Sequence, residues 1–167
     1  MKILKNNLKK FLSIRIIVAA VIISIISLPA VALAAPGDWS SLHWVGSGYE
    51  TVGTNVRAVQ QICTDSGFGS TVGDIDGYYG INTKTALGYY QTQHHIGSDG
   101  IAGSGTWNVM HSGLLYGYTA YYQYGNDQVY SYQGGSLVFG YSSTSGRWGY
   151  ETGDVDGSPV FTQLDYN

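Results

Sequence analysis

The sequence predicts an α+β protein in which an N-terminal bundle of three helices is followed by a small antiparallel β domain. Apolar residues recur at helical spacing in residues 54–66 and mark one side of residues 82–94 and 104–111. After Gly113 the composition changes to Tyr, Gly and Ser, and short β-prone runs alternate with turn residues. The 167 residues are enough for one or two small domains of this kind.

The first 34 residues have the order of regions found in a secretory signal peptide. Five basic residues, Lys2 to Arg15, precede an uncharged stretch, and Ala32-Leu33-Ala34 supplies the small residues of a cleavage site. We therefore expect a secreted, extracellular or wall-associated protein that begins at Ala35 and has no stable membrane insertion after cleavage. An uncleaved membrane anchor is the alternative, because the uncharged run over residues 16–36 approaches the length that spans a bilayer.

The charge of the remaining chain argues against a nucleic-acid partner. Beyond residue 34 only Arg57, Lys84 and Arg147 are basic, whereas all 11 acidic residues remain, which gives a formal charge of −8. Such a surface has few cations with which to neutralise phosphate groups. We expect no nucleic-acid binding.

One eight-residue pattern, D-G-x-x-G-x-x-T, occurs twice, at residues 76–83 and 99–106. The Asp of each copy can accept a hydrogen bond from the backbone two residues on, and the following Gly can adopt a positive φ. We expect the closing residues, Thr83 and Thr106, to satisfy unpaired N–H groups of the first helical turn. Each copy is therefore predicted to be a turn that leads into a helix at a fixed angle.

With the helix before it, this stretch resembles the small three-helix peptidoglycan-binding domain that many bacterial cell-wall hydrolases carry. The resemblance covers residues 47–112, about two-fifths of the chain. The matching positions are Val56, Arg57, Val59, Gln60, Asp76, Gly77, Tyr79, Gly80, Thr83, Ala86, Leu87, Tyr90, Gln91, Ile96, Asp99, Gly100, Ile101, Gly103, Thr106, Trp107 and Met110. Two positions differ from the family pattern: Cys63 stands where the family usually has Leu, and His95 stands where it has a Gly that ends the helix. The resemblance implies binding of peptidoglycan, with the glycan and the stem peptide both open as ligands.

These observations divide the chain into four predicted segments. They are a signal peptide at residues 1–34, a leader at 35–46, the three-helix peptidoglycan-binding-like domain at 47–112 and a Tyr/Gly-rich β domain of unknown family at 114–167. The leader is expected to pack on the helical domain through its tryptophans. The first helix is expected to end at Ser66-Gly67, and a Gly-rich connection then leads to the first turn. Strands are predicted at residues 118–124, 128–133, 136–141, 147–152 and 159–164.

Four residues of the helical domain are candidate ligand contacts: Tyr78, Tyr89, Gln91 and Asp99. The family pattern assigns Tyr79 and Tyr90 to the core, which leaves their neighbours free to face outward. An exposed tyrosine ring can stack on a sugar or hydrogen-bond a peptide, although an ordinary surface tyrosine is an equally weighted alternative. Gln91 and Asp99 are expected to lie near the same edge of the domain and to supply polar contacts.

Catalytic and metal-binding patterns are missing from the sequence. The four histidines lack zinc-ligand spacing, and only Glu50 and Glu151 could serve as glutamates in a glycosidase pair. Cys63 lies at an apolar helical position, so we expect a buried thiol, with an intermolecular disulfide as the alternative. Asp-x-Asp-Gly at residues 74–77 and 154–157 suggests calcium but lacks the rest of an EF-hand loop, so turns are predicted. We expect no catalytic residue, no metal and no cofactor.

The sequence thus predicts a secreted bacterial protein that binds peptidoglycan non-catalytically through its three-helix module. Because the chain and the teichoic acids of a wall are both anionic, attachment would need hydrogen bonds and stacking on carbohydrate or peptide. Two alternatives stay open. The β domain could be the catalytic part of a peptidoglycan hydrolase, or it could be a toxin-like or self-assembling protein that the helical domain delivers to the wall.

Overall fold

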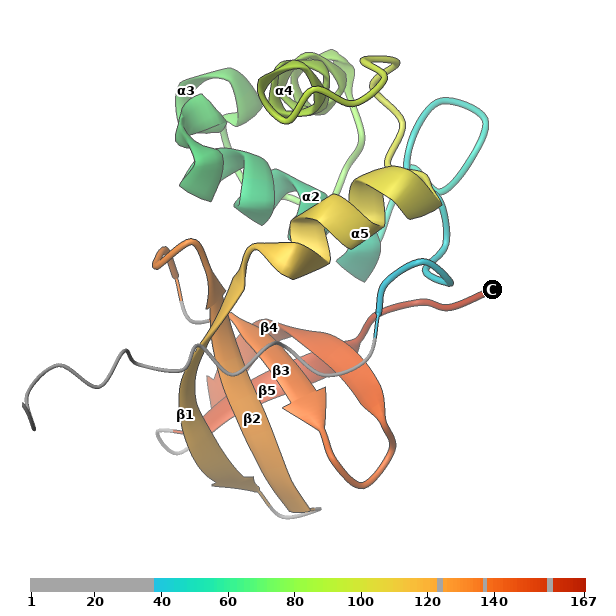
Figure 1. Ribbon diagram of the computed structural model, residues 1–167. Helices are drawn as coiled ribbons and strands as arrows, with labels where there is room; N and C mark the ends of the chain where they lie inside the picture. Colours follow the sequence, from blue (N-terminus) through green and yellow to red (C-terminus); the bar gives the residue numbers. More distant parts are fainter. Residues whose placement is uncertain (1–37, 123–124, 137, 156–157) are drawn as a thin grey trace, which may run out of the picture. The chain divides into compact units, whose positions relative to one another are not determined.

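The computed structural model describes residues 38–122, 125–136, 138–155 and 158–167 (Figure 1). The predicted signal peptide and the first residues of the leader lie outside these residues. The described residues all belong to one compact unit, and the domain boundary at Gly113 stays a prediction. Among the described helices, none combines the length and the apolar composition that a membrane span requires.

Three helical segments precede the sheet, as predicted. The first begins as α2 (Thr54–Cys63), widens into a π-helical turn, η1 (Thr64–Phe68), and ends as α3 (Gly69–Val72). It is followed by α4 (Ile81–Gln93) and α5 (Ser104–Ser112). At the end of α4, His95 has a φ of 55°, so it adopts the left-handed conformation for which the family uses Gly.

The first helix leaves helical geometry at Gly67, as predicted, but the Gly-rich connection after it was not expected to hold the further helical turn of α3. Gly67 has a φ of 93°, which only glycine adopts without strain. Two hydroxyl groups form hydrogen bonds on the N-terminal side of the kink: Thr64 Oγ1 donates to Gln60 O at 2.9 Å, and Ser66 Oγ donates to Ile62 O at 2.7 Å. Bonding of a Ser or Thr hydroxyl to the carbonyl four residues earlier often bends a helix, which agrees with the kink that follows.

The C-terminal part is a five-stranded antiparallel sheet, as predicted, and its strands follow the meander order β1-β2-β3-β4-β5 (Figure 1). The strands are β1 (Leu114–Tyr122), β2 (Gly125–Tyr132), β3 (Phe139–Ser142), β4 (Arg147–Val155) and β5 (Ser158–Gln163). The first strand begins directly after α5, four residues earlier than expected. Among the described tyrosines of this part, Tyr130, Tyr132 and Tyr150 are buried.

Buried side chains from the helices and from the sheet belong to one hydrophobic cluster. Trp39 of the leader has no exposed surface and lies 5.6 Å from the ring centroid of Trp107, 5.5 Å from Phe139 and 5.6 Å from Trp148. The leader was expected to pack on the helical domain, and Trp39 in fact contacts both α5 and the sheet. A hydroxyl pair, Tyr90 Oη and Tyr132 Oη at 2.9 Å, adds a buried polar link between α4 and β2.

Candidate functional site

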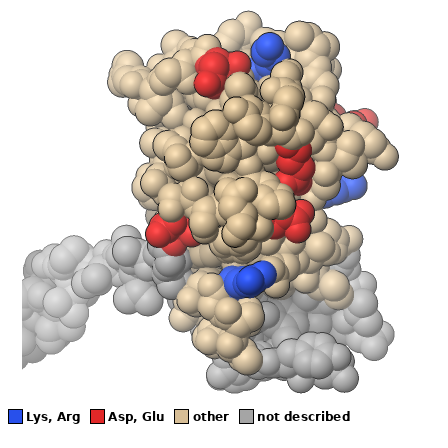
Figure 2. Space-filling view, turned by 90° about the vertical axis from the view of Figure 1, so that its right-hand side faces the viewer, with Lys and Arg blue, Asp and Glu red and all other residues tan. Residues whose placement is uncertain are grey.

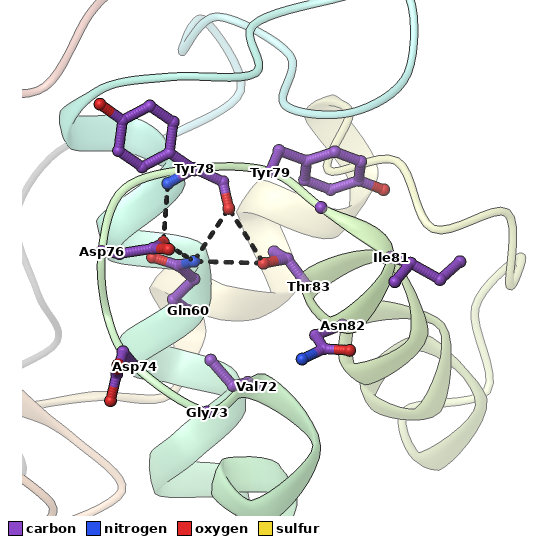
Figure 3. A pocket seen from close by; sticks show the side chains of 11 residues that line it. Gln60, Val72, Gly73, Asp74, Asp76, Tyr78, Tyr79, Ile81, Asn82 and Thr83 are labelled. Atoms are coloured by element: carbon purple, nitrogen blue, oxygen red, sulfur yellow. Dashed lines mark hydrogen bonds between the residues drawn. The ribbon is translucent and has the colours of Figure 1, made fainter.

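The first Asp-Gly turn is built around Gln60, a buried residue of α2 (Figure 3). Its Nε2 group lies 2.8 Å from Asp76 Oδ1, 3.2 Å from Tyr78 O and 3.1 Å from Thr83 Oγ1. Its Oε1 accepts the N–H of Gly77 at 2.8 Å. One amide thereby joins α2, the turn and the first turn of α4.

Gln91 of α4 repeats this arrangement at the second Asp-Gly turn. Its Nε2 group lies 3.0 Å from Asp99 Oδ1, 3.0 Å from Ile101 O and 3.1 Å from Thr106 Oγ1, and its Oε1 accepts the N–H of Gly100 at 2.9 Å. Helix α4 therefore receives the first turn at its start and supplies the glutamine of the second. The sequence repeat is a repeat of tertiary contacts as well as of local conformation.

Most of the local geometry predicted for these turns is confirmed. Asp76 Oδ1 accepts the N–H of Tyr78 at 2.8 Å, and Asp99 Oδ1 accepts that of Ile101 at 2.8 Å. Gly77 and Gly100 have φ values of 79° and 75°. The hydrogen bonds that Asp76 accepts, first from Gln60 and then from the Tyr78 N–H, hold its pKa below the usual value.

The role predicted for the two threonines was wrong. The N-cap residues are glycines, and neither α4 nor α5 has a side-chain cap hydrogen bond in the described structure. Thr83 is the third helical residue, so its side chain points back toward the N-terminus, where its hydroxyl meets Gln60 and the Tyr78 carbonyl. Thr106 does the same with Gln91 and the Ile101 carbonyl. The hydroxyls lock the turn to the helix instead of capping it.

Replacing Gly77 with valine is expected to lower the free energy of unfolding by about 1–3 kcal/mol, since a β-branched residue would be forced to a positive φ. A Cβ atom there would also lie 3.0 Å from Arg57 Nε and 3.3 Å from Gly53 O. Gly105→Ala is the matched control, because the position is helical and open, so this change should be neutral or stabilising. Thermal melts of the two variants measure the difference.

The same melts test the calcium alternative. Among the described residues, no group of three or more His, Cys, Asp or Glu side chains is arranged to hold a metal ion. We expect the melting temperature of the unchanged protein to be the same with calcium and with a chelator. A clear rise with calcium would contradict the assignment of these sequences to turns.

Two hollows lie beside α4, one at its start and the other along most of its length. The larger, of about 550 Å³, is lined by Tyr78, Asn82 and other residues of the first turn (Figure 3). The second, of about 340 Å³, is lined by residues that include Lys84, Tyr89 and Asp99. Ile81 lines both hollows and is 75% exposed, so it forms an apolar boundary between them.

The four predicted ligand contacts have different surroundings in this surface. Tyr78 and Tyr89 are 63% and 53% exposed, and the Tyr89 ring lies 5.9 Å from that of Phe68. Asp99 is exposed at the rim of the smaller hollow, with Oδ1 engaged in the second turn. Gln91 is buried, and its amide group forms hydrogen bonds within the second turn. The geometry thus gives Gln91 a structural role in the second turn.

Tyr79 and Tyr90 were both assigned to the core, and the structure agrees fully for Tyr90 and partly for Tyr79. Tyr90 is buried. Tyr79 is half-buried, and its hydroxyl donates to Gly100 O in the second turn. Burial raises the pKa of Tyr79 to about 12, and nearby Asp99 adds to the shift. Sequence reasoning missed Ile81, although an apolar residue directly after the turn glycine, outside the helical apolar face, is a signal that could have been read.

Comparison with known families supports the assignment of this region. Residues 52–110 match the model of a family described as "Putative peptidoglycan binding domain". The match spans both Asp-Gly turns, both glutamines and the two hollows. Comparisons with curated proteins and with solved structures gave no match.

Proposed function

We propose that this chain, whose residues 52–110 carry a peptidoglycan-binding domain, is a secreted wall-associated protein that binds peptidoglycan without cleaving it. The observation that supports this proposal best is the exposed apolar surface along α4 and the turn before it, where Tyr78, Ile81 and Tyr89 line two hollows. Large apolar side chains gathered on a hollowed surface are typical of a ligand-binding site.

The proposed contacts divide into stacking and hydrogen-bonding groups. The rings of Tyr78 and Tyr89 offer flat faces for the C–H groups of a sugar or for a peptide plane, and each carries a hydroxyl at its edge. Asn82, Lys84 and Asp99 line the same hollows and offer amide, ammonium and carboxylate groups to hydroxyls and peptide bonds. Lys and Arg side chains lie apart from one another on the face drawn in Figure 2, so attraction by a basic patch is not part of the proposal.

Binding to purified sacculi is expected to survive at about 1 M salt, because the Debye length there is about 3 Å and the proposed contacts are short-ranged. Tyr78→Ala and Tyr89→Ala should each weaken binding by about 1–3 kcal/mol, since each removes a stacking ring. Leu115→Ala removes an exposed apolar side chain from β1 and serves as the control that should bind normally. Sedimentation of the full chain with sacculi, followed by quantification of the unbound protein, gives the affinities.

The same preparation distinguishes the alternatives. Release of soluble muropeptides from sacculi by the purified chain would identify a hydrolase and overturn the non-catalytic proposal. If the double variant Tyr78→Ala/Tyr89→Ala sediments with sacculi as well as the unchanged protein does, recognition lies elsewhere in the chain, and the β domain becomes the next candidate.

A further inference from the structure

A third hollow is formed where residues 43–50 meet residues 165–167. It measures about 740 Å³ and is lined by His43, Trp44, Tyr49, Glu50 and Asn167. None of these residues lines either of the hollows beside α4. Sites for small molecules usually have volumes of about 300–1,000 Å³, so this hollow is large enough for a ligand of its own.

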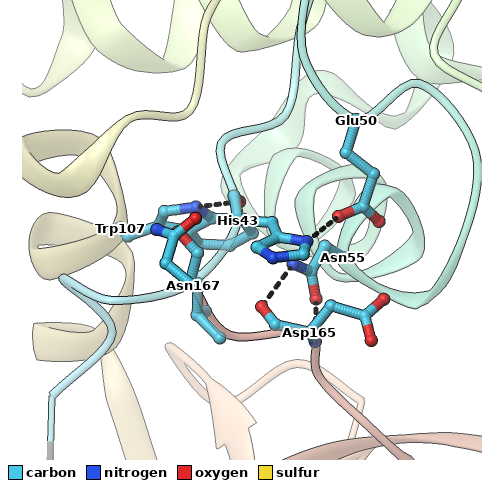
Figure 4. A network of polar contacts seen from close by, with 7 residues as sticks. His43, Glu50, Asn55, Trp107, Asp165 and Asn167 are labelled. Carbon is cyan, nitrogen blue, oxygen red and sulfur yellow. Dashed lines mark hydrogen bonds and ion pairs between the residues drawn. The ribbon is translucent and has the colours of Figure 1, made fainter.

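Hydrogen bonds between distant segments hold the chain around this hollow. His43 N donates to Asp165 O at 2.9 Å, and His43 O accepts the indole N–H of Trp107 at 3.0 Å. Asn55 and the backbone of Asp165 exchange two further bonds, of 3.0 and 2.9 Å (Figure 4). The walls are therefore fixed by the fold itself, and binding would not have to order them.

One wall of the hollow is a corner formed by two aromatic rings. The ring centroids of Trp44 and Tyr49 lie 5.0 Å apart at an interplanar angle of 52°. Trp44 is 39% exposed and Tyr49 is 49% exposed. The Trp44 ring also rests against Gly103, the residue before α5, since a Cβ atom there would lie 3.4 Å from the ring. The corner thus combines a fixed position with ring surface that a ligand can reach.

The side chains that line the hollow present no exposed carboxylate. Glu50 is the one acidic residue among the described residues that line it, and both of its carboxylate oxygens are inaccessible to solvent. His43 Nδ1 lies 3.7 Å from Glu50 Oε2, so the carboxylate faces an imidazole of the protein itself. A positively charged ligand would find no anionic partner on these side chains. The hollow therefore suits a neutral ligand.

Polar groups stand around the aromatic corner. Tyr49 carries a hydroxyl at the edge of its exposed ring, and 46% of the His43 side chain is exposed. Asn167 is exposed as well, and its Nδ2 group donates to Leu42 O at 3.2 Å, which leaves the amide oxygen for a ligand. These groups include both donors and acceptors of hydrogen bonds. A ligand with an apolar face and several hydroxyl groups would use both parts of the hollow.

We propose that this hollow binds a neutral sugar residue of a glycan strand, with one face of the pyranose ring against Trp44 and its hydroxyl groups toward the polar groups around the corner. The C–H groups of a pyranose face pack against an aromatic ring, and the hydroxyl groups exchange hydrogen bonds with polar groups at the edges of the site. A divalent metal fits less well, because the described residues hold no group of three ligating side chains. A purely aliphatic ligand would leave the polar groups of the hollow without partners.

In peptidoglycan, the neutral sugar is N-acetylglucosamine. This identification of the source rests on the proposed function, whereas the binding of a neutral sugar by the hollow does not. The hollow would add recognition of the glycan to the contacts proposed along α4, so that one chain would touch the wall polymer at two places.

The exposed tryptophan gives a readout that is specific to this hollow. Trp39, Trp107 and Trp148 are at most 1% exposed, so acrylamide quenches the fluorescence of the full chain chiefly at Trp44. Chitotetraose, a soluble tetramer of N-acetylglucosamine, is expected to protect Trp44 from acrylamide in a saturable way. Acetyl-norleucine amide, an aliphatic compound without hydroxyl groups, should protect far less. In Trp44→Phe the quenchable signal should disappear, which checks its origin.

Substitutions at Tyr49 test the corner while they keep the fluorescent reporter. Tyr49→Ala removes one of the two ring faces and should lower the association constant for chitotetraose by about tenfold. Tyr49→Phe keeps the ring and removes only the hydroxyl, so it should lose less affinity. Leu115→Ala removes an exposed apolar side chain from β1 and should leave the constant unaltered. Thermal melts of all three identify any variant that is misfolded.

Sacculus binding, measured on the same preparations, separates this proposal from the proposed function. Protection of Trp44 by chitotetraose in a chain that does not bind sacculi would support the sugar site and overturn the proposed function. Binding to sacculi that depends on Tyr78 and Tyr89, without protection of Trp44 by chitotetraose, would overturn the sugar site and support the proposed function.

Three further results would overturn the sugar site. Equal protection by chitotetraose and by acetyl-norleucine amide would mean that the rings accept any apolar ligand. Stronger protection by a soluble stem peptide than by chitotetraose would identify a peptide site. An unchanged association constant in Tyr49→Ala would mean that the sugar does not contact the aromatic corner.

Discussion

Replacing Trp39 with alanine is expected to lower the free energy of unfolding by about 3–5 kcal/mol, the usual range for a large buried aromatic side chain. Trp39 is fully buried and lies 5.5–5.6 Å, between ring centroids, from Trp107, Phe139 and Trp148. Its removal would leave a cavity bordered by α5 and by the sheet. Because two elements border this cavity, a shift of only one of them would not fill it. Chemical denaturation of the full chain gives the free energy and its dependence on denaturant.

Trp44→Ala is the matched control, because it removes the same type of side chain from the same leader at a partly exposed position. Its expected effect is about 1 kcal/mol or less. Similar losses in the two variants would mean that Trp39 does not join the helices to the sheet. Since Trp39 precedes residue 47, stability and binding are best measured on chains that retain the leader.

Replacing Gln60 with glutamate is expected to lower the free energy of unfolding by about 3–5 kcal/mol at neutral pH, the range for an unpaired buried charge. The amide group of Gln60 donates toward Asp76 Oδ1, Tyr78 O and Thr83 Oγ1. A carboxylate of the same shape would direct an acceptor at a carboxylate and at a carbonyl, with little exposure to water. Gln91→Glu should behave alike, because the second turn has the same contacts.

Gln93→Glu provides the control, since Gln93 is an exposed residue at the end of α4. This change should alter stability by about 0.5 kcal/mol or less. Denaturation curves of the three variants, recorded together, compare them directly. If the Gln60 variant were as stable as the Gln93 variant, the central role of the buried amide would be contradicted.

The parts of the fold that the sequence predicts well are those that neighbouring residues determine. The Asp-Gly turns depend on a carboxylate two residues from the N–H it accepts and on a glycine with positive φ, and both features can be read locally. The left-handed conformation of His95 and the meander order of the strands also follow from short-range patterns. The family pattern contributed the helical bundle and the burial of Tyr90.

The features that escaped prediction depend on contacts between distant segments. Gln60 reads as one more polar residue in an amphipathic helix, and only the fold brings it to a turn 16 residues away. Trp39 could be placed on the helical domain but not at its junction with the sheet. Asn55 and Asp165 exchange two hydrogen bonds although they are 110 positions apart in the chain, and nothing local relates them.

The burial of Cys63 in α2 bears on redox chemistry. Desolvation raises the pKa of this thiol to about 12. Only the thiolate attacks disulfides and alkylating reagents, so the folded protein carries very little of the reactive form at neutral pH. An intermolecular disulfide is therefore disfavoured while the chain stays folded. Once the chain unfolds, the thiol regains its ordinary acidity, so the rate of Cys63 alkylation gives a second measure of how often each variant opens.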